Sequence, residues 1–351
     1  MKKRIALIFG GEGKEHRISE ISAANLSELI DEALYDVLLV GISRSGDWYI
    51  YNGARDKIND GSWISDKSLL IPTYPVKING SSGFITGDGI IPVCCAIPCL
   101  HGDFGEDGIV QGALTCAHID YIGQSVCASA VTGDKIYTKL ASERLGIPTA
   151  KWTLETSADA AKARAHAEGV LSYPMFIKPA SLGSSYGAAP VLSSDDFDAA
   201  YKEARRLDER VLIEALIPFE YELECALFDD GKRLLSPGGR ILSNGEFYDY
   251  NSKYGNDHAP LIEAYSGKDA EIEKQIFDYA EKLSDFIGLR HLSRIDFFVT
   301  RDKRIYFNEI NTFPGMTESS LYPRLTEDMG LKKGSFINLL IDKVCSYDRR
   351  I

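Results

Sequence analysis

The chain has 351 residues, with 39 Lys and Arg against 51 Asp and Glu, and a formal net charge of −12. Its length suggests two or three domains. Hydrophobic and charged fractions of 44% and 26% exclude a disordered or collagen-like chain. An acidic chain lacks the basic face that binds polyphosphate, so we expect no nucleic-acid partner. The charge does not exclude a local basic pocket for a nucleotide.

The chain has no run of about 18 apolar residues, so we expect no membrane partner. The apolar run from Ile5 to Phe9 is too short for a signal-peptide core and predicts a strand, which favours a cytoplasmic location. Seven cysteines without CxxC spacing predict reduced, buried thiols and no zinc site. They are Cys94, Cys95, Cys99, Cys116, Cys127, Cys225 and Cys345.

The first third of the chain alternates strand and helix patterns. We predict a strand over 4–9, a helix over 19–29, and strands over 35–42, 48–52 and 90–100. This order indicates an α/β fold with a parallel sheet, whose ligands lie at the carboxyl ends of the strands. Gly10-Gly11 and His101-Gly102 fall at two such ends.

A smaller α+β module follows. A helix over 135–145 ends at the stop signal Gly146-Ile147-Pro148. After it we predict helices over 158–168 and 195–207 and strands over 175–177 and 188–192. The last part holds strands over 211–214, 221–228, 294–299 and 305–310, and helices over 270–287 and 336–344.

A loop of small residues, Pro179 to Gly187, follows a predicted strand that ends at Lys178. Small residues let backbone N–H groups approach phosphate oxygens, and the lysine adds a compact positive charge. The segment is not a Walker A loop. Taken alone, it is more often a plain hairpin.

Two late strands carry the clearest chemistry. Arg294 and Asp296 share one face of the first strand, and Glu309 and Asn311 share one face of the second. If the strands pair, Asp296, Glu309 and Asn311 converge as hard oxygen ligands for Mg²⁺ or Mn²⁺, and the arginine can stabilise developing negative charge. The alternative, a solvated ion-paired face, is disfavoured by the apolar flanking residues.

Other polar residues stay ambiguous from spacing alone. Glu15 is equally well a charge at a helix start or a ligand for a substrate amine. His101, alone in its loop, is more often structural than catalytic. Glu214 and Glu222 fit a solvated strand face, or acceptors for the adenine and ribose of a nucleotide.

The combined motifs resemble the D-alanine–D-alanine ligase family of the ATP-grasp superfamily, which includes the vancomycin-resistance ligases. The resemblance covers nearly the whole chain, in the segments FGGEGKEHRIS, LHGDFGEDGIVQG, GDKIYTK, FIKPASLGSSYG, ELECAL, FYDYNSKY, SRIDFF and FNEINTFPGMTESSLYP. It implies a Rossmann-like N-terminal domain over 1–123, followed by two α+β ATP-grasp lobes over 124–212 and 213–351 that clamp ATP. It also implies a cytoplasmic homodimer that uses ATP and two Mg²⁺ or Mn²⁺ ions.

The reaction implied is peptidoglycan precursor synthesis through an acyl phosphate. ATP phosphorylates the carboxylate of a first D-alanine, and the amine of a second D-amino acid attacks it. The lobes must exclude water, because water would hydrolyse the intermediate.

The resemblance assigns roles residue by residue. The first substrate's ammonium is bound by Glu15, and Ser184 and Tyr254 are hydrogen-bonded to that glutamate. His101 is a further residue of the substrate site. The ATP phosphates are held by Lys135, Lys178, the Ser184 and Ser185 amides, and Lys253 of a loop over about 244–257 that we expect to be disordered without nucleotide. Adenine and ribose are bound by Glu214 and Glu222. The oxyanion hole is formed by Arg294 and the Gly315 amide, the metal is held by Asp296, Glu309 and Asn311, and the second substrate is bound by Ser320 and Leu321.

Four positions depart from the family pattern, at Arg17, Tyr186, Tyr221 and Ser319. None removes a catalytic group. Lys253-Tyr254 and Leu321 favour D-alanine as second substrate, and a D-alanine–D-serine or D-alanine–D-lactate ligase is the nearest alternative. A non-catalytic nucleotide-binding protein and a carboxylase-type ATP-grasp enzyme are the more distant ones.

Overall fold

A computed structural model of the chain describes residues 2–242, 261–317 and 320–346. The first sheet has the strand order β4-β3-β2-β1-β8. Its strands are β1 (Lys3–Gly10), β2 (Tyr35–Ile42), β3 (Trp48–Tyr51), β4 (Leu70–Pro72) and β8 (Cys95–Pro98). The predicted parallel pairing is confirmed for β1, β2 and β8, whereas β3 and β4 add antiparallel strands at one edge.

The single strand predicted over 90–100 is wrong. The chain forms two strands there, β7 (Gly89–Ile91) and β8, on either side of Pro92. Proline has no N–H to donate to a sheet, which ends β7. β7 instead pairs with a hairpin in a separate small sheet, which consists of β5 (Pro75–Ile78), β6 (Ser81–Thr86) and β7.

Short helices accompany the first sheet. Helix α1 (His16–Leu29) begins three residues before its predicted start and directly after the turn that follows β1. The other helices in this part of the chain are α2 (Asp56–Asn59), the 3-10 turns η1 (Ser62–Ile64) and η2 (Lys67–Leu69), α3 (Ile109–Cys116) and α4 (Val126–Thr132).

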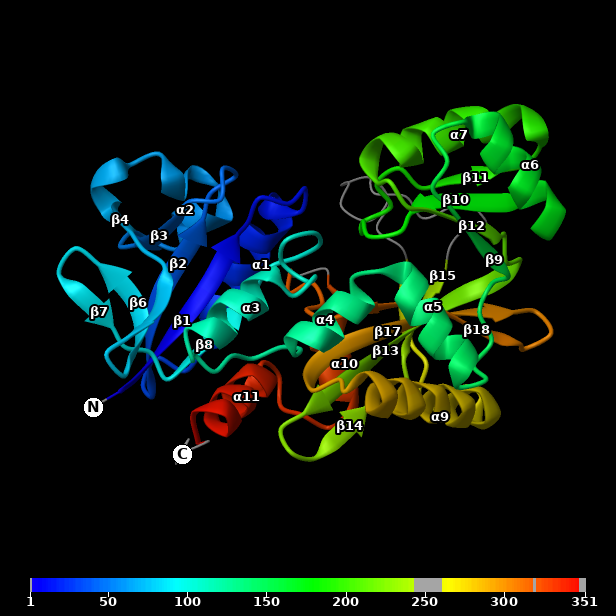
Figure 1. Cartoon of the computed structure of the whole chain (residues 1–351). Helices are drawn as coiled ribbons and strands as arrows, with labels where there is room; N and C mark the ends of the chain where they lie inside the picture. The colour runs from blue at the N-terminus through cyan, green and yellow to red at the C-terminus, as the bar shows by residue number, and fades with distance from the viewer. Residues whose placement is uncertain (1, 243–260, 318–319, 347–351) are drawn as a thin grey trace.

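The second sheet has the order β11-β10-β12-β9, and all its pairs are antiparallel. Helices α6 and α7 cover one face (Figure 1), and their alanine and aromatic side chains share a core with aliphatic side chains of the sheet. The elements are α5 (Lys135–Arg144), β9 (Trp152–Glu155), α6 (Ala160–Val170), β10 (Met175–Pro179), β11 (Ala189–Val191), α7 (Ser194–Leu207) and β12 (Val211–Ala215).

The third sheet has the order β16-β15-β13-β17-β18, with β14 paired to β13. Helix α9 (Ala270–Ile287) packs on it, capped by the Asp269 side chain and the left-handed Gly288. The strands are β13 (Phe219–Asp229), β14 (Arg233–Leu235), β15 (Gly239–Leu242), β16 (Leu261–Ala264), β17 (His291–Thr300) and β18 (Ile305–Asn311). Among the described helices, none combines the length and the apolar character that a bilayer span needs.

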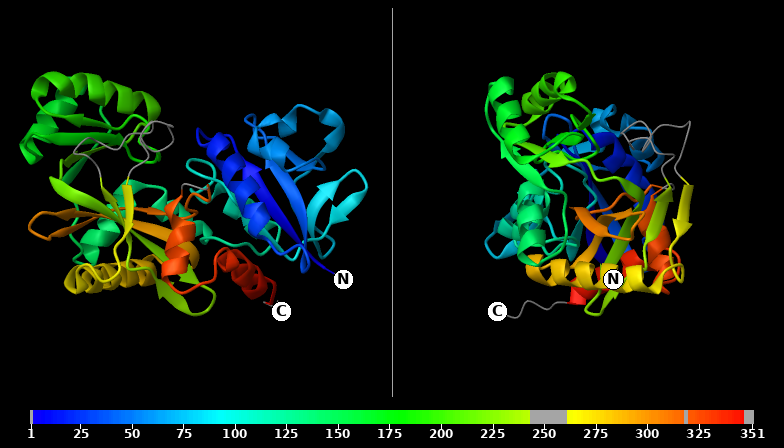
Figure 2. Two further views of the ribbon diagram at one scale, coloured as in Figure 1. Left: turned by 180° about the vertical axis from the view of Figure 1, so that it is seen from behind. Right: turned by 90° about the vertical axis from the view of Figure 1, so that its right-hand side faces the viewer.

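The first and third sheets share a hydrophobic core with the end of the chain. Helices α10 (Leu321–Asp328) and α11 (Ser335–Ser346) follow the third sheet, and α11 lies beside the first sheet (Figures 1 and 2). One hydrophobic core therefore contains both Leu7 of β1 and Leu340 of α11.

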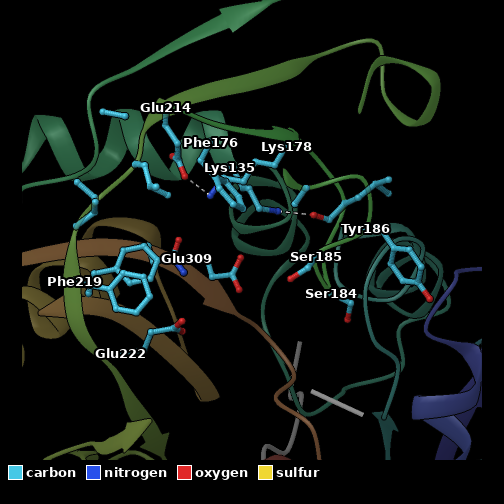
Figure 3. A pocket seen from close by; sticks show the side chains of 18 residues that line it. Lys135, Phe176, Lys178, Ser184, Ser185, Tyr186, Glu214, Phe219, Glu222 and Glu309 are labelled. Carbon is cyan, nitrogen blue, oxygen red and sulfur yellow. Dashed lines mark hydrogen bonds and ion pairs between the residues drawn. The ribbon is translucent and has the colours of Figure 1, made fainter. Parts of the chain in front are cut away.

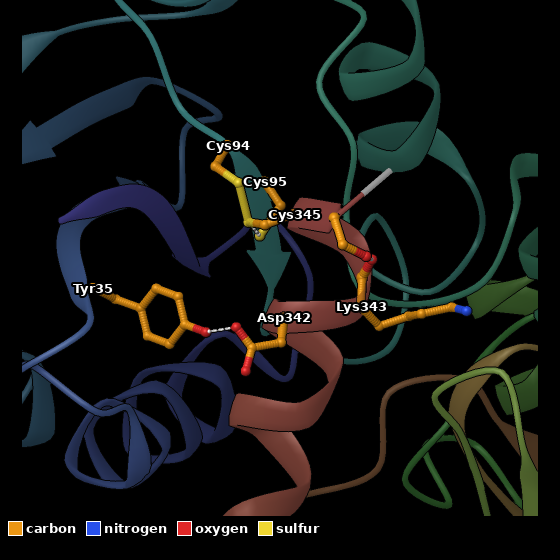
Figure 4. Close-up of a disulfide and its surroundings, with 7 residues drawn as sticks. Tyr35, Cys94, Cys95, Asp342, Lys343 and Cys345 are labelled. Atoms are coloured by element: carbon orange, nitrogen blue, oxygen red, sulfur yellow. Dashed lines mark hydrogen bonds between the residues drawn. A yellow bond between two sulfur atoms is a disulfide. The ribbon is translucent and has the colours of Figure 1, made fainter. Parts of the chain in front are cut away.

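The expectation that the cysteines are reduced and buried is wrong for four of them. Cys94 and Cys345 form a disulfide across 251 residues of sequence (Figure 4), and Cys116 and Cys127 are exposed. Because α11 returns to the first sheet, the fold brings together two cysteines that no short spacing connects.

Candidate active site

A cleft of about 810 Å³ opens between the second and third sheets (Figure 3). The cleft is lined by every described residue that was predicted to bind the nucleotide. These residues are Lys135, Lys178, Ser184, Ser185, Glu214 and Glu222. Glu309, assigned to the metal, lines the cleft as well.

The small-residue loop is both a hairpin connection and a wall of this cleft. It joins the antiparallel strands β10 and β11. Ser184 and Ser185 are in the left-handed region, at φ 49° and 57°. They stand in a turn, and the backbone N–H groups of a turn can form a concave site that suits an anion such as phosphate.

Glu214 binds two lysines, of which Lys178 lines the cleft. Its Oε1 lies 2.6 Å from Lys178 Nζ and its Oε2 2.8 Å from Lys139 Nζ. Burial raises the pKa of the Glu214 carboxyl, but the two ammonium groups outweigh it and lower the pKa to about 2. Glu214 therefore stays ionised, and its contact with adenine or ribose stays a prediction.

Lys139 was missed by the sequence analysis. It is 2% exposed, and its Nζ also donates to Thr149 Oγ1 at 2.8 Å. Lys135, four residues earlier on α5, donates from Nζ to the carbonyl of Leu182 at 2.6 Å. Burial lowers the pKa of both lysines. The i, i+4 spacing in GDKIYTK was the available signal, since such residues share one helix face.

Aromatic side chains form the apolar part of the cleft. The rings of Phe219 and Phe298 stack with centroids 4.7 Å apart and planes 19° from parallel. Phe176 and Glu222 line the same space (Figure 3). A flat apolar wall with an acceptor beside it suits a planar base with a polar edge.

The predicted metal ligands converge as the strand pattern required. β17 and β18 pair so that Asp296 lies opposite Glu309 and Arg294 opposite Asn311. Asn311 Nδ2 donates to Asp296 Oδ2 at 2.9 Å. Two carboxylates and an amide are hard oxygen donors that fit Mg²⁺ or Mn²⁺. Within the described part of the chain, no group of three or more Asp, Glu, His or Cys side chains could hold a metal ion. The amide oxygen of Asn311 is therefore needed as a third ligand.

Arg294 is fixed beside this site. Its Nε and Nη2 donate to the two oxygens of Asp296 at 2.8 and 2.7 Å. Its Nε also lies 3.0 Å from Oε2 of Glu224, a residue that the sequence analysis did not single out. The guanidinium is partly buried, and carboxylates bind it on two sides.

A second cavity, of about 910 Å³, adjoins the cleft. It shares Gly183, Ser184 and Glu309 with the cleft, so these residues separate the two spaces. All described residues predicted to contact the amino-acid substrates line it. They are Glu15, His101, Ser184, Arg294, Gly315, Ser320 and Leu321.

Glu15 enters this cavity from the turn before α1. It is 7% exposed, and its Oε1 accepts a hydrogen bond from the Ser184 hydroxyl. Its Oε2 lies so close to Gly102 that a side chain there would collide with it. Of the two interpretations of Glu15, the buried position favours a ligand-binding carboxylate over a simple helix-start charge.

His101 is a neutral connector between helix α1 and the loop that contains Phe313. Burial lowers its pKa to about 4. Its Nδ1–H donates to the carbonyl of Phe313 at 3.0 Å, and its Nε2 accepts from Ser22 Oγ at 2.9 Å. The same Ser22 oxygen accepts from the Met316 N–H at 3.2 Å. Both ring nitrogens are thus occupied, which favours the structural role for this histidine.

Glu106 makes a parallel connection and was also missed. Its carboxylate accepts from the N–H groups of Gly102 and Phe313, both at 2.9 Å, and from Thr312 Oγ1 at 3.1 Å. Burial raises its pKa despite these hydrogen bonds. The glutamate stands within the quoted motif LHGDFGEDGIVQG, so its position in a strand-end loop was the signal.

Arg17 and Tyr221 both point away from the two cavities. Arg17 donates to Glu20 Oε2 at 2.8 Å and to the Ile58 carbonyl at 3.2 Å. The Tyr221 hydroxyl is 2.9 Å from that of Tyr265. Neither departure from the family pattern touches the site.

Tyr186 does line the cleft, and Lys14 Nζ lies 4.9 Å from its ring centroid. Lys253, Tyr254, Ser319 and the 244–257 loop lie outside the described residues.

The chain matches the family model described as D-ala D-ala ligase N-terminus over residues 4–124 and the model described as its C-terminus over 141–342. It is 34% identical to the D-alanine–D-alanine ligase of Thermoanaerobacter sp. (strain X514), over 97% of this chain and 96% of the relative. It is 36% identical to that of Ruminiclostridium cellulolyticum, over 97% and 95%.

Solved structures agree with this result. The VanG D-Ala:D-Ser ligase from Enterococcus faecalis has a TM-score of 0.88 at 33% identity, covering 98% of this chain and 100% of that one. The D-alanine–D-alanine ligase from Coxiella burnetii has a TM-score of 0.82 at 29% identity, covering 98% and 95%. The α/β fold predicted from the sequence is confirmed.

Proposed function

Because the chain belongs to the D-Ala–D-Ala ligase family, we propose that it joins two D-alanines with ATP, for peptidoglycan precursor synthesis. The observation that carries this proposal is the shared wall of the two cavities. Ser184 and Glu309 line both the cleft suited to a nucleotide and the cavity suited to small amino acids. A phosphoryl group bound at this wall lies next to both spaces, as transfer from ATP to a carboxylate requires.

ATP lies in the cleft with its base against Phe219 and Phe298. Lys135, Lys178 and the Ser184 and Ser185 amides hold its phosphates. The lysines are pre-oriented, Lys178 by Glu214 and Lys135 by the Leu182 carbonyl, so little reorganisation is needed when phosphate binds. By resemblance, Lys253 also binds the phosphates, and it lies outside the described residues.

Asp296, Glu309 and Asn311 would hold the divalent cations, and we propose two Mg²⁺ or Mn²⁺ ions. Bound cations neutralise phosphate charge during phosphoryl transfer. Asn311 donates its amide N–H to Asp296, so rotation of that amide would present its oxygen as the third ligand.

The first D-alanine binds in the second cavity. Its ammonium pairs with Glu15, supported by the Ser184 hydroxyl and, by resemblance, by Tyr254. Its carboxylate points to the shared wall and receives the phosphoryl group. Ser320 and Leu321 bind the second D-alanine, whose amine attacks the acyl phosphate. Arg294 and the Gly315 N–H stabilise the tetrahedral oxyanion, and phosphate leaves.

His101 and Glu106 position the site without touching the reacting atoms. Both bind the Phe313 backbone and so fix the loop that carries Gly315. We further propose a cytoplasmic homodimer, with an N-terminal domain over 1–123 and ATP-grasp lobes over 124–212 and 213–351.

The test is an assay of the purified protein with ATP, Mg²⁺ and D-alanine. We expect ADP release that depends on D-alanine, together with D-alanyl-D-alanine by mass spectrometry; L-alanine is the control. If ADP release does not depend on D-alanine, or if no ADP is released, the protein binds nucleotide without this ligase activity. D-Serine and D-lactate are offered in turn, because a D-Ala:D-Ser ligase is among the similar structures. A much higher kcat/KM with D-serine would mean that D-serine, rather than D-alanine, is the second substrate.

A further inference from the structure

The tip of the small-residue loop meets the turn before α1 at two neighbouring points. The Ser184 hydroxyl donates to the Glu15 carboxylate. One residue earlier in the turn, Lys14 Nζ lies 4.9 Å from the centroid of the Tyr186 ring. An ammonium group at this distance over an aromatic face makes a cation–π contact. The proposed reaction uses Ser184 and Glu15 but gives Lys14 and Tyr186 no role.

The loop is attached to two different parts of the molecule. Its base is bound beside the second sheet, where Ser181 donates from its N–H and from its hydroxyl to Asp208 Oδ2 at 2.9 and 2.6 Å. Its tip contacts the turn that follows β1 of the first sheet. A movement of the second sheet away from the first therefore has to break the contacts at the tip.

The tip needs such contacts because its backbone conformation is unfavourable. Ser184 and Ser185 have φ angles of 49° and 57°, in the left-handed region that is uncommon for residues other than glycine. Residues stay in such a conformation when the surrounding structure holds them. The contacts to Glu15 and Lys14 fix the loop on either side of Ser185.

The two contacts differ in their exposure to solvent. Glu15 is 7% exposed, whereas Lys14 is exposed and Tyr186 is half-buried. Tyr186 lies at the end of the nucleotide cleft beyond Ser185 (Figure 3). The contact between Lys14 and Tyr186 is therefore the solvent-facing edge of the loop's attachment, and the Glu15 contact is its inner part.

We infer that Lys14 and Tyr186 are positioning residues whose contact clasps the loop to the turn before α1 and so keeps water from the acyl phosphate. This inference rests on the proposed ligase function. Water that reaches the acyl phosphate adds its hydroxyl and its proton across the bond between the acyl group and phosphate. D-Alanine and inorganic phosphate are then released, and ATP is consumed without a dipeptide.

The first experiment compares wild type, Tyr186→Leu and Tyr186→Phe, which keeps the aromatic face that the ammonium group contacts. Each protein receives ATP, Mg²⁺ and D-alanine, and ADP and dipeptide are measured together. In Tyr186→Leu we expect the ADP that is not matched by dipeptide to rise about two- to fivefold, which corresponds to the loss of an exposed cation–π contact. Tyr186→Phe should match wild type.

Lys14 tests the same contact from the other side. Lys14→Arg keeps a cation over the ring and should match wild type, whereas Lys14→Met should show the same excess of ADP as Tyr186→Leu. Combining Lys14→Met with Tyr186→Leu should add little to either single change, because the contact is already lost. Lys162→Met, at an exposed helix position, should leave ADP and dipeptide as in wild type.

Hydrogen exchange of the amides over 181–187 measures the attachment of the loop without turnover. We expect exchange about two- to fivefold faster in Tyr186→Leu than in wild type and in Tyr186→Phe. Unchanged exchange would show that the two residues do not hold the loop, and the inference would be wrong. Faster exchange with ADP and dipeptide still matched would also overturn it, because the contact would then not exclude water.

The two proposals fail in different ways. A wild type that makes no dipeptide overturns the ligase function, and with it the protection of an acyl phosphate. Hydrogen exchange still decides in that case whether Lys14 and Tyr186 hold the loop. A wild type that makes dipeptide, with no excess of ADP in Tyr186→Leu or Lys14→Met, overturns the inference and leaves the ligase function in place.

Discussion

The Ser184 hydroxyl donates a hydrogen bond to the Glu15 carboxylate across 169 residues of sequence. This contact joins the turn before α1 to the small-residue loop of the second sheet. The same loop lines the nucleotide cleft, so this one hydrogen bond connects the cleft with the carboxylate that is proposed to bind the first substrate's ammonium.

Glu15→Gln should weaken first-substrate binding while sparing the nucleotide. Glutamine keeps the hydrogen bond from Ser184 but removes the charge, so we expect kcat/KM for the first D-alanine to fall about 10- to 100-fold. The KM for ATP should change less than threefold. Steady-state kinetics measure both values, and the exposed Glu12→Gln is the control. An unchanged kcat/KM would remove Glu15 from the site.

Lys139→Met should destabilise the protein and weaken ATP binding together. The change leaves Glu214 with one of its two lysines, and breaking a buried ion pair costs about 3–5 kcal/mol. Urea unfolding and the KM for ATP measure the two effects. Lys162→Met, at an exposed helix position, should leave both unchanged. If Lys139→Met matches that control, the lysine has no part in the cleft.

Acidification should destabilise the protein partly through His101. Its folded pKa of about 4 lies below its ordinary 6.5, so the unfolded state binds more protons between these values. Stability is therefore lost as the pH falls from 6.5 toward 4, by at most about 1.4 kcal/mol per pH unit for this group. His101→Asn should flatten the pH dependence of the unfolding free energy.

The flattening should be partial, because burial lowers the pKa of His291 to about 4 as well. His118→Asn changes an exposed histidine with φ of 52°, a conformation that asparagine tolerates. It should keep the wild-type slope. The same slope in His101→Asn would mean that His101 is not held neutral.

Glu309→Gln should abolish turnover by weakening the metal site. Removing one charged ligand from a set of two carboxylates and an amide lowers affinity for a hard cation. Electron paramagnetic resonance of Mn²⁺ measures binding without activity, and we expect affinity to fall at least about tenfold. Asp302→Asn, at the exposed turn between β17 and β18, is the control. Normal Mn²⁺ affinity in Glu309→Gln would refute the assignment.

The disulfide fixes how many free thiols the unreduced protein should contain. The denatured chain should titrate five thiols without reductant and all seven cysteines after reduction. Reduction should lower the unfolding free energy by about 2–4 kcal/mol, and Cys345→Ser should lose this response to reductant. Cys116→Ser, an exposed free cysteine, should keep it. Seven thiols in the unreduced protein would show that the bond is absent.

The strand and helix patterns predicted most elements of the chain because their periodicity is local. The predictions over 35–42 and 270–287 coincide with β2 and α9. Of the four-residue strands, β3 was predicted over 48–52 but β9 was missed, because so short a segment holds only two alternations. The split at Pro92 was missed because the apolar residues on its two sides look continuous.

The sequence by itself determined the family, the order of its motifs and the strand faces on which Asp296, Glu309 and Asn311 lie, since alternation along a strand is a local property. Only the tertiary structure decided which partners those residues meet. Lys139 against Glu214, Glu224 against Arg294, His101 between Ser22 and Phe313, and Cys94 against Cys345 all join segments far apart along the chain. Their contacts depend on how the sheets pack, and packing is set by the buried surfaces of the whole molecule rather than by any one segment.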